Sequence, residues 1–469
     1  MITLILIICL IRAFKFKPET KVEKVVEPVT FDKEKAVNDL CEMVKCKTIS
    51  NRDFSLEDDD EFKKFEEKLV AMFPMVHATC PKENIGRRGI QFYWKGLSSE
   101  KATVLMSHFD VVEVDESGWE KAPFDGIIEG ETLWGRGTLD TKSTLNGCLQ
   151  AVETLIKEGF TPQNDIYLCF SGDEEISGPT CPEMVDEFAR RGINVELVVD
   201  EGGAVVENVF PGVKDRVAVI GIAEKGMLNL SYTVKSKGGH ASSPPAHTPI
   251  GILSKACCKV ESKPFKANFT APTLALFDTL GRRSTFLYRL IFANMWLFKP
   301  VLSLIGKMGG GEINALMRTT CAFTQMKGST GLNVLPAQAE MCSNFRIMTG
   351  ETMESTIEYV KKVIDDDRVE VNVVSGNNPS IVSRTDCQEF NIVKEAVEEA
   401  FPDAVVTPYL MFACSDSQNY GRISDKVYRF SAQSMSSEER RTIHGHNERI
   451  SFKGIWECVE FYLRLIKKC

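Results

Sequence analysis

From about residue 102 onward, short apolar runs alternate with amphipathic segments, and this alternation limits the fold more than any other feature of the chain. We expect strands at 103–108, 165–171 and 195–200, and helices at 142–158 and 182–191. Strands that alternate with helices in this way are typical of βαβ units on a mainly parallel sheet. The sequence therefore predicts an α/β fold.

The pattern changes near residue 224, where glycine-rich and longer alternating segments begin, and it returns after about residue 347. Further helices are expected at 353–364, 387–400 and 452–467, and a further strand at 427–431. The simplest organisation is an α/β domain made of residues 33–223 and 348–469. A smaller α+β domain, residues 224–347, would be inserted into it.

Composition limits the class of partner. The 469 residues are 43% hydrophobic and 26% charged, as in ordinary globular proteins, and the formal net charge is -9. A nucleic-acid surface needs clustered lysine and arginine to neutralise phosphates, so the negative net charge argues against a nucleic-acid partner. We expect a small-molecule or peptide substrate.

The N-terminus is almost wholly apolar from Ile2 to Ile11 and is followed by basic residues. The run is shorter than the roughly 20 residues of a spanning helix and suits a secretory signal or an uncleaved anchor within residues 1–17. Residues 18–32 would then be a linker. This predicts a secreted, lysosomal, vacuolar or membrane-anchored protein, with membrane association through the N-terminus as one option; the alternative is an apolar helix of a cytoplasmic protein.

A second apolar stretch covers residues 286–305, where Arg289, Asn294 and Lys299 interrupt the apolar side chains. Its longest unbroken run is too short to span a membrane. It is either a buried helix or an amphipathic surface that faces lipid or an acyl chain.

Acidic residues and histidines gather where the expected strands end. They are His108 and Asp110, Asp173 to Glu175, Asp200 and Glu201, with Asp140 at the head of helix 142–158 and His444 near the C-terminus. Ligands of open α/β sheets bind at the carboxyl ends of strands. Carboxylates that converge there would repel one another without a cation, and a mixed imidazole and carboxylate set favours Zn²⁺ over Mg²⁺ or Ca²⁺. The sequence therefore predicts a metal site.

The spacing of His108 and Asp110 adds a detail. Residues two apart on a strand face the same side, so Asp110 can accept the second ring N–H of His108 and fix its tautomer.

Eight motifs in order carry a family resemblance: "SHFDVV", "GWEKAPFDG", "LWGRGTLDTK", "SGDEEISG", "VVDEGG", "GGHASSPP", "NVLPAQAEMCSNFRI" and "HGHNERIS". From about residue 35 to the C-terminus the chain resembles the di-zinc metallopeptidases that include aminoacylase, carboxypeptidase S and glutamate carboxypeptidase. It is most similar to the carboxypeptidase S branch, which includes secreted N-acyl-amino-acid hydrolases. The resemblance implies a zinc-hydrolase catalytic domain, with the inserted domain as a lid or dimerisation domain, and a homodimer as one option.

The resemblance also implies two Zn²⁺ per chain and a set of ligands. His108 and Asp200 would bind one zinc, Glu175 and His444 the other, and Asp140 would bridge both. It further implies a cis peptide bond between Asp140 and Thr141.

Catalytic and substrate-binding roles follow from the same resemblance. Glu174 would be the general base, and His240 the donor to the developing oxyanion, brought in by domain closure or by a partner subunit. Arg346 and Asn333 would bind the carboxylate of the substrate. A loop histidine at 240 and a structural salt bridge at 346 are the alternatives.

The expected activity is zinc-dependent hydrolysis of an amide bond next to a free carboxylate, as in a carboxypeptidase or an N-acyl-amino-acid hydrolase. The alternative is a catalytically inactive, membrane-associated metal-binding protein on the same fold.

Overall fold

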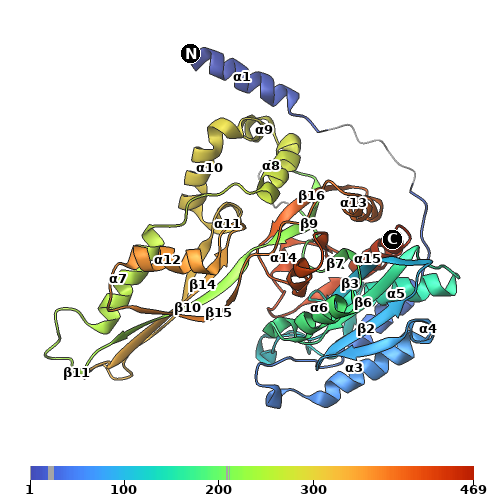
Figure 1. Cartoon of the computed structure of the whole chain (residues 1–469), viewed down its shortest axis with the longest axis horizontal. Coiled ribbons are helices and arrows are strands. Elements are labelled where there is room, and N and C mark those ends of the chain that lie inside the picture. Colours follow the sequence, from blue (N-terminus) through green and yellow to red (C-terminus); the bar gives the residue numbers. More distant parts are fainter. Residues whose placement is uncertain (1, 19–25, 208–209, 211) are drawn as a thin grey trace.

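The computed structural model describes residues 2–18, 26–207, 210 and 212–469, so residues 19–25 of the expected linker lie outside the described part. A large sheet covered by helices and a separate small antiparallel sheet make up the molecule (Figure 1). The large sheet is mainly parallel, with antiparallel pairs at the β1–β2 edge and around β9, which confirms the predicted fold class.

The large sheet has ten strands. Their order across the sheet is β1 (Lys82–Ile85), β2 (Gly89–Trp94), β6 (Asn164–Ser171), β3 (Ser98–His108), β7 (Val195–Asp200), β17 (Val427–Arg429), β9 (Arg216–Glu224), β8 (Val205–Val206) and β18 (Ser434–Met435), with β16 (Ala404–Met411) paired to β9. Strands β3, β6, β7 and β17 run parallel, so their carboxyl ends meet at one edge.

Both faces of this sheet are covered. One face carries α2 (Lys33–Val44), α3 (Asp59–Met72), α4 (Pro74–Thr79), α5 (Lys142–Lys157), α13 (Gln388–Ala400) and α15 (Phe452–Ile466), and the other carries α6 (Thr180–Arg191). Alternate side chains of each strand enter opposite cores: Leu105 of β3 packs with α5 and α15, whereas Val104 packs with Met184 of α6. Because both faces of these strands are buried, their sequences are short apolar runs rather than alternating apolar and polar residues.

The small sheet has the order β12 (Thr320–Lys327), β14 (Gln338–Ile347), β10 (Gly226–Lys235) and β15 (Glu370–Asn377). Helices α7 (Pro249–Ser262) and α12 (Met353–Ile364) cover one of its faces. Beyond them, β11 (Gly239–His240) pairs with β13 (Val334–Leu335) at the far tip (Figure 1).

The expected domain boundary at residue 347 needs correction. Strand β15 pairs with β10 along most of its length, and α12 packs on the same small sheet. The segment 348–377 therefore belongs with the small sheet and not with the second part of the α/β domain. The local sequence pattern of α12 and β15 would fit either domain. Only the elements that they pair with or pack against show to which domain they belong.

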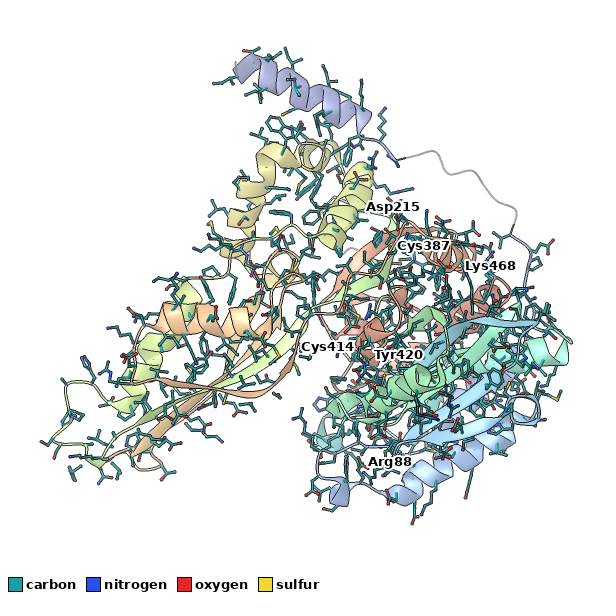
Figure 2. The ribbon with its side chains drawn as sticks, in the orientation of Figure 1. Arg88, Asp215, Cys387, Cys414, Tyr420 and Lys468 are labelled. Carbon is teal, nitrogen blue, oxygen red and sulfur yellow. The ribbon has the colours of Figure 1, made fainter. Side chains whose placement is uncertain are left out.

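The two sheets are joined at Lys225, the single residue between β9 and β10. Its side chain is buried and donates to the carbonyl oxygen of Arg318 at 2.7 Å. Figure 2 shows Cys414 at the same junction, where its Sγ lies 3.6 Å from Nη1 of Arg346.

The apolar stretch 286–305 forms two helices with a sharp break between them. They are α9 (Phe286–Phe292) and α10 (Met295–Gly309), and they lie between α8 (Ala271–Arg283) and the short α11 (Gly311–Ala315). Helix α8 packs against β16 of the large sheet, and α1 (Ile2–Lys15) packs against α9 (Figure 1). Two smaller elements complete the site described next: the helix α14 (Ser437–Arg440) and a three-stranded sheet of β4 (Ile127–Glu129), β5 (Thr132–Trp134) and β19 (Arg449–Ser451).

Candidate metal centre

Asp140 stands between two groups of metal-binding side chains and offers one carboxylate oxygen to each. Its Oδ1 lies 3.0 Å from Nε2 of His108, and its Oδ2 lies 3.0 Å from Nε2 of His444. The peptide bond from Asp140 to Thr141 is cis, as the family resemblance implied. A carboxylate placed in this way can bridge two cations.

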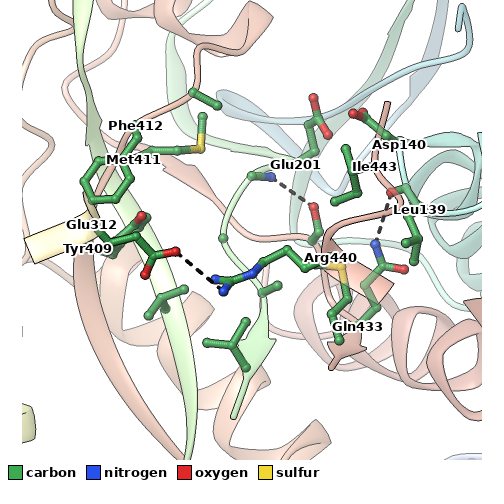
Figure 3. Close-up of a pocket in the computed structure, with 18 of the residues that line it drawn as sticks. Leu139, Asp140, Glu201, Glu312, Tyr409, Met411, Phe412, Gln433, Arg440 and Ile443 are labelled. Carbon is green, nitrogen blue, oxygen red and sulfur yellow. Dashed lines mark hydrogen bonds and ion pairs between the residues drawn. The ribbon is translucent and has the colours of Figure 1, made fainter. Parts of the chain in front are cut away.

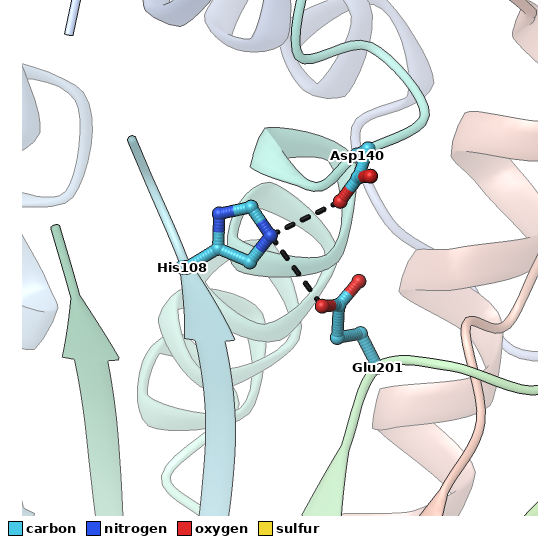
Figure 4. A group of neighbouring side chains, drawn as sticks. All are labelled: His108, Asp140 and Glu201. Carbon is cyan, nitrogen blue, oxygen red and sulfur yellow. Dashed lines mark hydrogen bonds and ion pairs between the residues drawn. The ribbon is translucent and has the colours of Figure 1, made fainter. Parts of the chain in front are cut away.

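The first donor group consists of His108, Asp140 and Glu201 (Figure 4). His108 is the last residue of β3, and Glu201 directly follows the neighbouring strand β7. Oε1 of Glu201 lies 3.4 Å from Nε2 of His108. Two parallel strands thus deliver these ligand atoms to the same sheet edge.

The second donor group consists of Asp140, Glu175 and His444. Oε2 of Glu175 lies 3.0 Å from Nε2 of His444, and its Oε1 is buried without a hydrogen-bond partner among the described residues. His444 has a φ of 58°, and it lies in the turn between α14 and β19. A buried carboxylate oxygen without a partner is costly unless a cation binds it.

The donor atoms suit a metal such as zinc. Each group mixes imidazole nitrogen with carboxylate oxygen, and donors around one tetrahedral zinc lie about 3.3 Å apart, close to the separations found here. Hydrogen bonds to Asp140 and Glu175 raise the pKa of His444 to about 10. Burial, with the charge of Asp140, raises the pKa of Glu201 to about 7. A bound cation would take the place of the protons that these groups otherwise hold.

One expected ligand is not in either donor group. The carboxylate of Asp200 accepts the backbone N–H of Ser417 at 3.1 Å, and the adjacent Glu201 occupies the place expected for Asp200. Consecutive residues at the end of a strand point to opposite sides, so a shift of one position replaces one acid by the other. The family resemblance assigned this ligand to Asp200, whereas the donor group of the structure contains Glu201.

Asp110 organises both sides of the centre. Nδ1 of His108 lies 3.1 Å from the carbonyl oxygen and 3.3 Å from Oδ1 of Asp110. The same carboxylate accepts the backbone N–H groups of Glu174 and Glu175 at 3.2 and 3.1 Å, and the hydroxyl of Ser50 at 2.6 Å. Because Asp110 is fully buried, it fixes both the ring of His108 and the turn that carries the two glutamates.

Glu174 belongs to neither donor group. It begins a short 3₁₀ helix that ends at Ile176, and its side chain lines the pocket beside the centre. Burial, together with the negative charges of Asp416, Glu201 and Glu175, holds the pKa of Glu174 well above its usual range. This arrangement favours a carboxyl that can carry a proton near neutral pH.

A buried ion pair between Arg136 and Glu448 lies behind Asp140, and neither residue was singled out from the sequence. Nη1 of Arg136 lies 2.6 Å from Oε2 of Glu448, while Nη2 donates to the carbonyl oxygen of Gly445 at 2.8 Å. Oε1 of Glu448 accepts three backbone N–H groups, from Gly137, Leu139 and Asp140, at 3.1, 2.8 and 3.2 Å. The pair ties the loop of Asp140 to the loop of His444. Both charges stand in motifs noted above, but nothing in the pattern shows that they are buried.

A cavity of about 650 Å³ opens beside the two donor groups (Figure 3). Its polar end holds the side chains of the centre and Arg346 of β14. The rest is largely apolar, lined by Val206, Phe210, Val217, Val219, Leu276, Leu280, Leu316, Met411 and Met435. Glu312 and Arg440 form an ion pair at 3.5 Å in its wall and thereby link α11 to α14 (Figure 3).

Two expected site residues lie elsewhere. His240 and Asn333 are exposed on the β11 and β13 tip of the small sheet, where the N–H of Ala241 donates to the carbonyl oxygen of Asn333 at 2.9 Å. Nδ1 of His240 lies 2.7 Å from Oγ of Ser242. The structure thus brings His240 and Asn333 close to each other but does not place them in the cavity.

Comparison with known proteins gives the family of the chain. The family model "Peptidase family M20/M25/M40" matches residues 104–468. A probable carboxypeptidase S-like 2 of Dictyostelium discoideum is 33% identical over 99% of this chain and 92% of its own length. The N-fatty-acyl-amino acid synthase/hydrolase PM20D1 of Xenopus tropicalis is 34% identical over 86% of this chain and 80% of its own.

A solved structure shares the fold. The M20 family metallo-carboxypeptidase Sso-CP2 from Sulfolobus solfataricus superposes with a TM-score of 0.68 at 18% identity, over 92% of this chain and 98% of that one. The chain is a hydrolase that belongs to peptidase family M20/M25/M40.

Proposed function

We propose that the protein is a di-zinc hydrolase that cleaves the amide bond of an N-acyl amino acid or a peptide next to a free carboxylate. The observation that carries the proposal is the position of Asp140, which offers one oxygen to each of two imidazole and carboxylate groups beside a cavity. His108 and Glu201 would hold one ion, and Glu175 and His444 the other. Two bound zinc ions would lower the pKa of a shared water and polarise the carbonyl group of the substrate.

The protein side chains then move the protons. Glu174 lies next to the ligand Glu175, and its raised pKa suits a base that accepts a proton from the attacking water. The same carboxyl can return this proton to the leaving amine. Asp110 supports the step by holding the backbone of Glu174 in place.

Arg346 is proposed to bind the carboxylate of the substrate. It lies in the wall of the cavity that also contains the metal centre, and a guanidinium can bind a carboxylate through two parallel hydrogen bonds. His240 and Asn333 would join the substrate only after closure of the small sheet or from a partner subunit, since both lie on the exposed tip.

The apolar part of the cavity favours an acyl chain over a dipeptide. Leu276 and Leu280 of α8 line this region together with Val217 and Val219 of β9, and a hydrocarbon chain bound there would be removed from water. One relative of similar length carries the name N-fatty-acyl-amino acid synthase/hydrolase, which agrees with this choice.

The deciding experiment compares hydrolysis of N-acyl amino acids of increasing chain length with hydrolysis of dipeptides by the zinc-loaded protein. We expect kcat/KM to rise with chain length and to exceed the dipeptide values. Faster cleavage of dipeptides would assign a carboxypeptidase instead. Zinc binding without turnover of any substrate would favour an inactive metal-binding protein on the same fold.

A further inference from the structure

Helix α1 is apolar around its whole circumference and yet exposed. Eight of its fourteen residues are large apolar side chains that are at least 41% exposed: Ile2, Leu4, Leu6, Ile7, Ile8, Leu10, Ile11 and Phe14. A helix that is hydrophobic all round is normally buried in a protein core or in lipid. The described parts of the chain do not cover these side chains.

Helix α1 nevertheless makes specific contacts with the rest of the protein. Cys9 and Ala13 are buried on its inner side, and Nδ2 of Asn294 donates to the carbonyl oxygen of Cys9 at 3.0 Å. Nε of Arg12 donates to the carbonyl oxygen of Ala293, also at 3.0 Å. Asn294 and Ala293 form the break between α9 and α10, so α1 is held at that bend.

Helix α10 continues the exposed apolar surface. Its exposed large apolar side chains are Trp296, Leu297, Val301, Leu304, Ile305 and Met308. Apart from Trp296, they recur at intervals of one, three or four residues, which places them on one face of the helix. We call the exposed apolar side chains of α1, α9 and α10 the apolar platform; Figure 1 shows the three helices together at one end of the molecule.

No single described helix is long and apolar enough to cross a membrane. Helices α9 and α10 reach the required length and hydropathy only as a pair, and this pair is bent by 107°. Helix α1, with fourteen residues, is about 21 Å long, short of the roughly 30 Å of a hydrocarbon core. The geometry therefore suits helices that lie along a membrane surface rather than helices that span it.

Basic side chains predominate around the platform, although two of them are paired with acids: Arg282 lies 2.8 Å from Asp278, and Arg283 lies 4.0 Å from Asp215. Residues 282–309 contain five basic side chains and no acidic one: Arg282, Arg283, Arg289, Lys299 and Lys307. Residues 1–17 add Arg12, Lys15 and Lys17, again without an acid. In a chain with a net charge of -9 this local excess of positive charge is complementary to anionic lipid headgroups. Trp296 and Tyr288, both exposed, are of the types enriched at the membrane interface.

The platform is also fixed to the catalytic part of the molecule. Phe292 at the end of α9 is buried against Phe277 of α8 and Phe210, with ring centroids 5.3 and 5.1 Å apart. Phe210 in turn lines the cavity beside the metal centre. The outer side of this helical group thus faces solvent, while its inner side packs next to the cavity.

We propose that the apolar platform docks the protein onto the surface of an anionic lipid bilayer, with α1 and α10 lying in one leaflet. Their apolar faces enter the acyl region, and the basic side chains at their edges contact phosphate groups. Docking concerns the outer face alone and does not depend on the reaction proposed above.

Flotation of the full-length protein with lipid vesicles tests the proposal. We expect binding to phosphatidylcholine vesicles that contain about 30% phosphatidylserine, weaker binding to phosphatidylcholine alone, and partial loss of binding in high salt. The variant Trp296→Glu/Leu304→Glu/Ile305→Glu changes only exposed side chains, so its fold should hold. Its affinity should fall about 100-fold or more, because three apolar groups leave the membrane.

A matched control carries the same change of charge elsewhere. Leu56, Leu97 and Val374 are 70%, 73% and 61% exposed and lie outside the platform. The triple variant Leu56→Glu/Leu97→Glu/Val374→Glu should bind vesicles like the unmodified protein. Equal losses in the two triple variants would show a general charge effect and would overturn the proposal.

Two further outcomes would also overturn it. If deletion of residues 2–17 abolishes binding while the α10 variant binds normally, the N-terminal segment alone is the anchor. If the unmodified protein does not bind vesicles, and the α10 variant differs from it in oligomeric state, the platform is an interface between copies of this chain. Quenching of Trp296 by brominated lipid, lost in Trp296→Phe, would place α10 directly in the leaflet.

Discussion

Glu448 and Arg136 form a buried ion pair, with Oε2 of Glu448 2.6 Å from Nη1 of Arg136. Both side chains are almost fully buried, and the other oxygen of Glu448 holds the backbone that leads to Asp140. Glu448 is therefore a positioning residue that acts on the metal centre through Asp140.

Glu448→Gln should weaken both folding and metal binding. The amide can still accept the backbone N–H groups, but Arg136 then keeps an uncompensated buried charge, at a cost of about 3–5 kcal/mol. Denaturant unfolding and zinc titration measure the two effects. The double variant Arg136→Met/Glu448→Gln should lose less stability than the sum of the single variants. Additive losses would show that the pair is not coupled.

Glu201→Gln and Asp200→Asn separate the two candidate ligands. Glu201 lies within the first donor group, so its amide variant should lose about one zinc per chain. Asp200 accepts an N–H from Ser417, and Asp200→Asn should retain both ions. Zinc analysis after dialysis decides, and loss of metal in the Asp200 variant alone would restore the assignment made from the sequence.

Glu174→Gln and Glu175→Gln distinguish a base from a ligand. The first variant should keep both zinc ions and the fold while kcat falls about 10²- to 10⁴-fold, the usual contribution of a positioned base. The second should lose zinc together with activity, because Glu175 belongs to the second donor group. Full activity of Glu174→Gln would exclude the proposed proton transfer.

Leu276→Phe tests the acyl-chain site. Leu276 is almost fully buried in the apolar part of the cavity, and the larger ring should shorten it. We expect kcat/KM for long-chain N-acyl amino acids to fall about tenfold or more, with little change for N-acetyl substrates. Val374→Phe, on the exposed face of β15, is the control. An equal loss for short and long chains would point to a general packing defect.

Metal removal should make stability depend on pH. Burial raises the pKa of Glu201 from 4.5 to about 7. The folded metal-free protein therefore binds this proton more tightly than the unfolded chain does. The resulting stabilisation is complete below pH 4.5, and about 3 kcal/mol is lost as the pH rises to 7. Thermal unfolding with and without a chelator, at pH 5 and 8, measures this. A chelated protein that is equally stable at both pH values would contradict the protonation of Glu201.

Much of the fold could be predicted from local pattern, because strands and helices of the α/β part show their own periodicities. Helix 353–364 was placed correctly along the chain but in the wrong domain, because the strand that follows it, β15, pairs with β10, which lies more than 100 residues earlier. The choice between Asp200 and Glu201 depends on a related property, the side to which each residue points at the end of β7, and local pattern does not give it.

The candidate site was predictable to the extent that strand ends determine it. His108 ends β3, Glu175 comes shortly after the end of β6, and Asp140 precedes α5, so topology alone brings them to one edge. Arg136 and Glu448 show the limit, because a buried charge and a surface charge have the same appearance in a sequence. The proposed role of His240 at the site requires a movement of the small sheet or a second chain. A single static structure of one chain contains neither.

The place of β17 in the large sheet has a consequence for how the protein is made. This strand, residues Val427–Arg429, lies between β7 and β9, which are completed some 200 residues earlier. A chain emerging from the ribosome therefore holds two separate half-sheets until β17 has been synthesised. His444 and Glu448 arrive later still. The second donor group, which contains His444, is therefore completed only after the central strand β17 has been made.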